Sequence, residues 1–121
     1  MSGNPVAWFE ITGPDAKRLQ DYYGALFGWS MEVMDGYGVV APAEHGIGGG
    51  IGRSQDEGSG MVTFYVEVDD VAASLARAKA LGGTEIAPPT QVPGMDLTIA
   101  FFADPDGHVV GLSRGATASQ A

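Results

Sequence analysis

The chain has 121 residues, of which 45% are hydrophobic and 17% are charged, and its formal net charge is −9 with an isoelectric point near 4.3. This length and composition predict one globular domain, residues 1–121, with a single core. The acidity favours solubility and repels phosphate backbones, so we expect no nucleic-acid partner. No apolar run approaches the ~20 residues of a membrane span, so we expect no membrane partner either.

Cysteine is absent from the sequence. Its absence excludes disulfides, thiolate metal sites and a cysteine nucleophile, and it fits a reducing compartment. The amino terminus lacks a basic region followed by an apolar block, so no secretion signal is predicted. We therefore expect a cytoplasmic location.

An alternating stretch at residues 5–11 predicts the first strand. Successive side chains of a strand point to opposite faces. The apolar face, expected to pack on helices, consists of Ala7, Phe9 and Ile11. The mixed face, expected to border a wetter interior, consists of Val6, Trp8 and Glu10.

A helix is predicted from Pro14 to about Phe27, because proline suits the first helical position. Gly28 is the residue type that ends helices in a left-handed conformation. The apolar stripe of this helix consists of Leu19, Tyr22, Tyr23 and Leu26. Strands are then predicted at residues 29–34, 37–41 and 47–53, with a hairpin turn at Asp35-Gly36.

A polar linker at residues 54–60 precedes a second copy of this pattern. Residues 61–68 predict a strand whose mixed face consists of Thr63, Tyr65 and Glu67. Asp70 is the expected N-cap of a helix through Leu81, with Val71, Leu75 and Ala78 on its buried side. Strands at 84–87, 97–103 and 108–113 follow, with an irregular loop from Pro88 to Gly94, a turn at 104–107 and a disordered tail at 115–121.

The order βαβββ therefore occurs twice, at about residues 5–53 and 61–113. Neither half can bury both its helix and its strands alone. We expect an α+β fold in which two βαβββ repeats form a curved mixed sheet around a concave cavity, with the helices outside. A cavity between repeats is the default site for a small-molecule ligand.

These features resemble the vicinal oxygen chelate superfamily, which contains glyoxalase I, bleomycin-resistance proteins and extradiol dioxygenases. The segments that carry the resemblance cover roughly residues 5–113 and are Trp8–Ile11, Tyr22–Trp29, Tyr65–Val71 and Phe102–His108. The resemblance implies the fold more strongly than the function, because such folds host both catalysts and binders. It also implies a homodimer.

In enzymes of that superfamily a divalent metal is held by His, Gln and Glu side chains in the concave sheet. Carried onto this sequence, the ligand positions are Val6, Thr63, Gly111 and a position within Gly48–Ile51 that includes Gly50. Aliphatic side chains and glycine cannot ligate a metal, and threonine is a poor ligand. A shift by one residue would not help, because neighbours point to the opposite face. We therefore expect no metal and no cofactor.

Glu10 and Glu67 are the candidate catalytic residues, because both lie on mixed strand faces at equivalent places. Two carboxyl groups close together have pKa values that move apart, which suits acid–base chemistry. Alternatively, both lie near strand ends, where they are solvated or paired with Arg53 or Arg114.

The candidate ligand-binding residues are Trp8, Tyr65 and Phe102, with Val6, Thr63, Gly50 and Gly111 around them. Large amphipathic rings stack on flat ligands, but the same rings can instead fill the cavity as core. The glycines either leave floor space for a ligand or mark a weak, bulged strand.

Only two histidines occur. His45 beside Glu44 is either a general base with a carboxylate partner or a solvated loop tip. His108 is expected on the helix side of its strand, packed or at the surface.

The leading hypothesis is a metal-free small-molecule-binding protein that holds a partly aromatic or apolar ligand, with sequestration as the activity that the bleomycin-resistance branch implies. The alternative is a lyase, isomerase or hydrolase that uses Glu10 and Glu67, or a non-standard metal held by His45 and Glu44. A third interpretation is an interaction module without a ligand, with Trp8, Tyr65 and Phe102 filling the cavity.

Overall fold

The computed structural model describes residues 3–55 and 58–115, and the chain divides into two compact units. The first unit is Trp8–Thr63, and the second unit is Met1–Ala7 with Phe64–Ala121. The elements of the first repeat are β1 (Val6–Gly13), α1 (Ala16–Phe27), β2 (Met31–Met34), β3 (Tyr37–Val40) and β4 (Gly48–Arg53). Those of the second are β5 (Val62–Glu67), α2 (Val71–Ala80), β6 (Thr84–Gln91), β7 (Leu97–Ala103) and β8 (Val109–Gly115). The predicted α+β class with two βαβββ repeats is confirmed.

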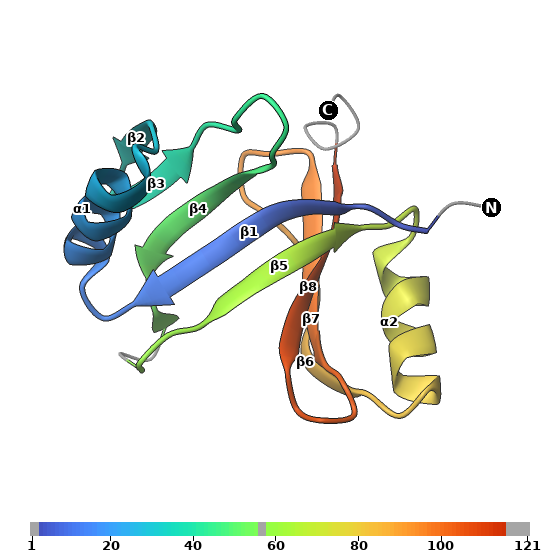
Figure 1. The fold of residues 1–121 in the computed structure, drawn as a ribbon. Helices are drawn as coiled ribbons and strands as arrows, with labels where there is room; N and C mark the ends of the chain where they lie inside the picture. The colour runs from blue at the N-terminus through green and yellow to red at the C-terminus, as the bar shows by residue number, and fades with distance from the viewer. Residues whose placement is uncertain (1–2, 56–57, 116–121) are drawn as a thin grey trace. The chain divides into compact units, whose positions relative to one another are not determined.

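In the first unit the strands are ordered β2-β3-β4-β1, with β1 parallel to β4 and the other neighbours antiparallel. Figure 1 shows α1 beside β2, β3 and β4. The core is built on Ile11, Val40 and Ile51, and the side chains packed against it are Phe9, Leu19, Tyr23, Trp29 and Met31. Of the predicted apolar face of the first strand (Ala7, Phe9 and Ile11), Phe9 and Ile11 therefore do pack in the core that α1 covers.

Helix α1 begins at Ala16, two residues later than the predicted start at Pro14, because Asp15 is its N-cap. The Asp15 carboxylate accepts a hydrogen bond from the Arg18 backbone N–H at 3.1 Å, which makes Asp15 the N-cap. At the other end Gly28 is left-handed as predicted, with φ 71°, and its N–H donates to the Gly24 carbonyl.

The predicted apolar stripe of α1 is only half correct. Tyr22 and Leu26 are 59% and 57% exposed, whereas Leu19 and Tyr23 pack on the core. The buried residue of α1 is Gln20, whose side-chain amide donates to the carbonyl oxygens of Gly36 at 3.0 Å and Ile51 at 2.9 Å. A polar side chain can take this buried place because both of its donor hydrogens are used.

The hairpin between β2 and β3 turns at the predicted dipeptide. Asp35 and Gly36 both have positive φ, at 54° and 82°. Two successive positive φ values are typical of the two-residue turn that matches the twist of a hairpin. This turn places Tyr37 as the first residue of β3.

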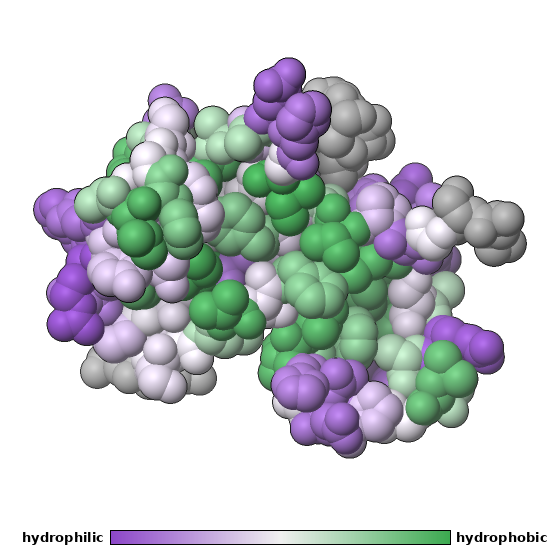
Figure 2. Space-filling model, viewed as in Figure 1, coloured by the Kyte–Doolittle hydropathy of each residue, from purple (hydrophilic) through white to green (hydrophobic). Residues whose placement is uncertain are grey.

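In the second unit the strands are ordered β5-β8-β7-β6, with β5 parallel to β8 and the other pairs antiparallel. Its core consists of Val68, Val71, Leu75, Ala100 and Leu112. Asp70 caps α2 as predicted, accepting from the Ala73 N–H at 3.0 Å, while Ala78 is only half-buried. Figure 2 shows hydrophobic residues gathered over the region of β6–β8.

The predicted irregular loop from Pro88 to Gly94 is wrong in its first part. Strand β6 continues through both prolines to Gln91, with register shifts between Glu85 and Ala87 and between Ala87 and Thr90. Proline cannot donate to a sheet ladder, and it is tolerated where one side of the strand has no partner. Strand β6 stands last in the order β5-β8-β7-β6, which explains why prolines fit there.

Neither described helix has the length and apolarity to cross a bilayer. Two parts of the sequence predictions fall outside the described residues: the middle of the linker, at residues 56–57, and most of the tail, at residues 116–121. Gly115, predicted to begin that tail, instead ends β8.

Candidate functional site

A polar cluster lies on the face of the first unit that points away from α1. Trp8 and Glu10 alternate with the core residues Phe9 and Ile11, so they share the opposite face of β1, as predicted. The Trp8 indole N–H donates to Glu10 Oε1 at 3.2 Å. The Tyr37 hydroxyl, from β3, donates to the same oxygen at 2.7 Å. Tyr37 is a site residue that no local pattern in the sequence indicates.

The ring of Tyr37 lies over the glycines of β4. Gly50 is paired with Glu10 in the ladder between β1 and β4. A Cβ at Gly50 would overlap the Tyr37 hydroxyl, and a Cβ at Gly52 would lie 2.7 Å from ring atom Cδ1 of Tyr37. The floor space that the sequence assigns to a ligand at Gly50 is therefore taken by a tyrosine ring.

Burial is the main influence on the Glu10 carboxyl, and it raises the pKa of that group above its ordinary value. The hydrogen bonds from Tyr37 and Trp8 act in the opposite direction, because they stabilise the charged form. Both donors are neutral, so neither supplies a positive charge. In the part of the chain that the structure describes, Glu10 has no ion pair.

The raised pKa of Glu10 predicts a pH-dependent effect of Glu10→Gln. The folded protein keeps this proton to higher pH than the unfolded chain, so stability falls as pH rises from about 4.5 through the folded pKa. Glutamine does not titrate, so the variant should be more stable than the parent near neutral pH and gain nothing below that window. Urea unfolding at about pH 4 and about pH 7 measures the difference. A gain of equal size at both values would contradict the prediction.

In the second unit a tyrosine again covers a glycine. Tyr65 on β5 is paired with Gly111 on β8, and a Cβ at Gly111 would lie 2.5 Å from Tyr65 Cδ2. Tyr65 is buried and meets Phe101 edge to face, with ring centroids 5.4 Å apart. The ring of Tyr65 therefore packs against Gly111 and Phe101, its neighbours on the same face of the sheet.

Phe102 does not share the face of Tyr65, which corrects the sequence prediction. It packs against the core that lies beneath α2, and Phe101 takes the predicted place. The prediction assumed a four-residue turn at 104–107. The N–H of Asp104 donates to the His108 carbonyl at 2.9 Å, so the loop includes His108 and Ala103 pairs with Val109. One extra loop residue exchanges the two faces of the strand.

The Glu67 carboxylate interacts with Ser113 and Arg114 of the second unit. Ser113 Oγ donates to Glu67 Oε1 at 3.5 Å. Burial raises the pKa of the Glu67 carboxyl, against the opposing effects of the Ser113 hydrogen bond and the positive charge of Arg114. Glu10 belongs to the first unit and Glu67 to the second, so their joint action stays a prediction.

Both histidines lie in exposed loops. His45 Nε2 is 4.0 Å from Glu44 Oε2, and both side chains are about nine-tenths exposed, at 90% and 89%. The two side chains therefore lie in solvent, as the loop-tip interpretation expects, and a role of His45 as a general base with Glu44 stays a prediction. His108 Nδ1 lies 3.0 Å from Asp104 Oδ2, and hydrogen bonds from His108 lower the pKa of the Asp104 carboxyl. His108 thus closes the turn at the surface.

A family model described as a glyoxalase-like domain matches residues 8–113 of this chain. The chain belongs to the glyoxalase-like domain family. Membership confirms the resemblance to the vicinal oxygen chelate superfamily. The glyoxalase-like chain is 33% identical over 127 residues to the anthracycline biosynthesis protein DnrV of Streptomyces peucetius, a match that covers 89% of this chain and 46% of the relative. It therefore spans about half the length of that relative.

Two further similarities agree with this family. The anthracycline biosynthesis protein DauV of a Streptomyces species (strain C5) is 32% identical over 127 residues, again covering 89% of this chain and 46% of the relative. The methylmalonyl-CoA epimerase of Mycobacterium tuberculosis matches in structure with a TM-score of 0.67 and 16% identity, covering 100% of this chain and 97% of that one. At that identity the epimerase supports the fold alone.

The residues of this glyoxalase-like domain do not fit the divalent metal of the superfamily. Val6 is 44% exposed and aliphatic, and Thr63 is buried and offers only a hydroxyl. At Gly50 and Gly111 the space for a side chain is filled by tyrosine rings. Within residues 3–55 and 58–115 no three His, Cys, Asp or Glu side chains come together as a metal site.

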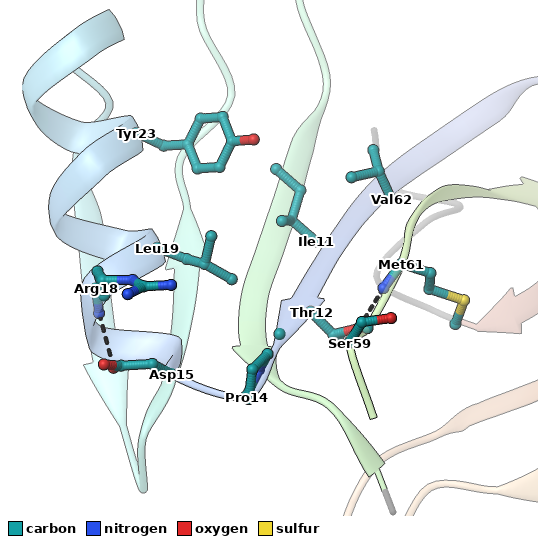
Figure 3. Close-up of a pocket in the computed structure, with 12 residues that line it drawn as sticks. Ile11, Thr12, Pro14, Asp15, Arg18, Leu19, Tyr23, Ser59, Met61 and Val62 are labelled. Atoms are coloured by element: carbon teal, nitrogen blue, oxygen red, sulfur yellow. Dashed lines mark hydrogen bonds between the residues drawn. The ribbon is translucent and has the colours of Figure 1, made fainter. Parts of the chain in front are cut away.

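Two cavities of the glyoxalase-like domain lie on the α1 side of the first unit. One, of about 340 Å³, is lined by Ile11–Asp15, Arg18, Leu19, Tyr23 and Ser59–Val62. Figure 3 shows Leu19 and Tyr23 extending from α1 toward Ile11 and Val62 across it. The other, of about 370 Å³, is lined by Gln20, Asp21, Gly24, Ala25, Trp29, Met31 and Val33. Neither cavity is the one that the sequence predicts, which lies on the mixed faces of the strands, away from the helices. That cavity stays a prediction.

Proposed function

We propose that this protein binds a flat, partly aromatic small molecule on the face of the first unit that carries Trp8, Tyr37 and Glu10. The observation that supports the proposal is the convergence of an indole and a phenol on one carboxylate oxygen. Such a group combines aromatic surface with a small number of fixed polar atoms, which is the usual composition of a small-molecule site.

The curated relatives support an aromatic ligand. Both are named for anthracycline biosynthesis, and anthracyclines contain a flat polycyclic ring system. A protein that lacks suitable metal ligands can still hold such a ring by stacking and hydrogen bonding. Sequestration of an aromatic compound is therefore the role that we propose, in place of metal-dependent catalysis.

Tryptophan fluorescence provides a direct test, because the chain has only two tryptophans. Trp29 packs between Phe9 and Tyr23 in the core, with ring centroids 5.1 Å and 5.7 Å away. In the Trp29→Phe variant all tryptophan emission comes from Trp8, and titration with an anthracycline should quench this emission until the site is saturated. In Trp8→Phe the remaining Trp29 should be quenched little.

Calorimetry on the same variants separates binding from quenching. The Trp29→Phe variant should keep the affinity of the parent, whereas Trp8→Ala should weaken binding about tenfold or more, in line with the ~1–3 kcal/mol of a stacked aromatic ring. Equal affinity in Trp8→Ala, with the fold intact by circular dichroism, would contradict the proposed site.

Tight stoichiometric uptake of Zn²⁺, Ni²⁺, Mn²⁺ or Fe²⁺ would contradict the proposal that the protein functions without a metal. Native mass spectrometry would test the expected homodimer.

A further inference from the structure

The two carboxylate oxygens of Glu10 differ in their protein partners. The indole N–H of Trp8 and the hydroxyl of Tyr37 both donate to Oε1. In the described part of the chain, Oε2 accepts no hydrogen bond and joins no ion pair. A carboxylate offers about four acceptor sites on its two oxygens. One oxygen of this partly buried group is therefore open to solvent and has no protein partner among the described residues.

The unused oxygen lies on a face with apolar neighbours. Val39 is paired with Gly50, the residue that is itself paired with Glu10, so these positions share one face of the sheet. Met34 is paired with Tyr37 and shares that face too. Val39 and Met34 are 41% and 66% exposed. The apolar part of a ligand could therefore contact the exposed side chains of Val39 and Met34 beside the carboxylate.

We propose that the ligand of this face is a cationic amine, whose ammonium group pairs with Oε2 of Glu10 while its aromatic body contacts Trp8 and Tyr37. This inference rests on the proposed function and names the chemical class of its ligand. The existing partners of Glu10 are both neutral, so no positive charge from them compensates the carboxylate, and an ammonium group would supply that charge together with N–H donors. Indole and phenol rings also attract cations through their π faces.

The net charge of the chain favours the same class. At −9, the protein attracts small cations and repels small anions. This general attraction does not by itself locate a site. The test must therefore distinguish a specific pairing with Glu10 from the field of the whole molecule.

Three probes that share one naphthylmethyl group and differ in the charged or neutral polar group attached to it provide the test. They are 2-naphthylmethylamine, 2-naphthylmethanol and 2-naphthylacetate, which carry an ammonium, a hydroxyl and a carboxylate. Calorimetric titration of the unmodified protein should give the tightest binding for the amine, by about tenfold over the alcohol, which corresponds to one charge-assisted contact. The carboxylate should bind most weakly.

The Glu10→Gln variant isolates the pairing. Glutamine keeps a side-chain oxygen that accepts from Trp8 and Tyr37, so the alcohol should bind as before while the amine falls to the affinity of the alcohol. Glu85→Gln is the matched control, because it removes one negative charge from an exposed position on β6 in the second unit. The control should keep the tenfold preference.

The outcomes separate this inference from the proposed function. Equal binding of all three probes to the unmodified protein would overturn the cationic class and leave an aromatic site intact. An equal loss of preference in Glu85→Gln and Glu10→Gln would overturn it as well, because net charge would then be the cause. Failure of the anthracycline and of all three probes to bind would overturn the proposed function itself.

Discussion

Replacing Gly50 with alanine should lower the free energy of unfolding by about 1–3 kcal/mol, the usual cost of overfilling a packed site. The new methyl group would overlap the hydroxyl of Tyr37, whose ring lies across β4. The ring would have to leave the glycine surface and give up its hydrogen bond to Glu10. Urea unfolding followed by circular dichroism measures the loss.

A double-mutant cycle shows whether the ring is the cause. In a Tyr37→Ala background the same Gly50→Ala change meets no ring, and it should be neutral or stabilising by a few tenths of a kcal/mol, because alanine restricts the unfolded chain. Gly46→Ala is the matched control, since its Cβ would meet only Ala43 at an ordinary 3.8 Å. A cost at Gly50 that is the same with and without Tyr37 would refute the explanation.

The fold could be predicted from the sequence because its signals are local. Alternation within residues 5–11 and 61–68, the cap at Asp70, the left-handed Gly28 and the turn at Asp35-Gly36 each depend on neighbours in sequence. Two repeats of one order then fix the class of the fold. Trp8 and Glu10 were placed on the correct face of β1 by parity alone.

The site could be predicted only in part, because it depends on which residues meet across strands. Tyr37 comes from a different strand than Glu10, and nothing local to residues 37–41 indicates the contact. A signal was nevertheless present: glycines at alternate positions of β4, Gly50 and Gly52, are typical of a strand crossed by a large side chain.

The exchange of Phe101 and Phe102 has a similar origin. Every residue of β7 was assigned to the correct strand, yet one additional residue in the following loop reversed the faces. Sequence patterns define the length of a strand better than its register. The burial of Gln20 could not be predicted for a different reason. A polar side chain is buried only where it finds hydrogen-bond partners, and its partners, the carbonyl groups of Gly36 and Ile51, are distant in sequence.

Replacing Gly60 with alanine should cost about 2–4 kcal/mol, the largest effect that we expect from a single glycine. Its φ is +86°, a conformation that costs a non-glycine residue roughly 1–2 kcal/mol. In addition, the new Cβ would overlap the carbonyl oxygen of Thr12. A backbone atom cannot rotate away as a side chain can, so the connection itself must shift.

The shift would break the contact that joins this segment to the end of β1. The Thr12 N–H donates to the Met61 carbonyl at 2.9 Å, and the Met61 N–H donates to Thr12 Oγ1 at 3.1 Å. Gly58→Ala is the matched control, because it lies two residues away and its Cβ would meet only the Gln55 carbonyl oxygen at 3.8 Å. Urea unfolding of both variants should separate them by at least ~1–2 kcal/mol, the conformational part of the cost alone. If the two lose equal stability, the close approach of this segment to β1 is not what requires glycine at position 60.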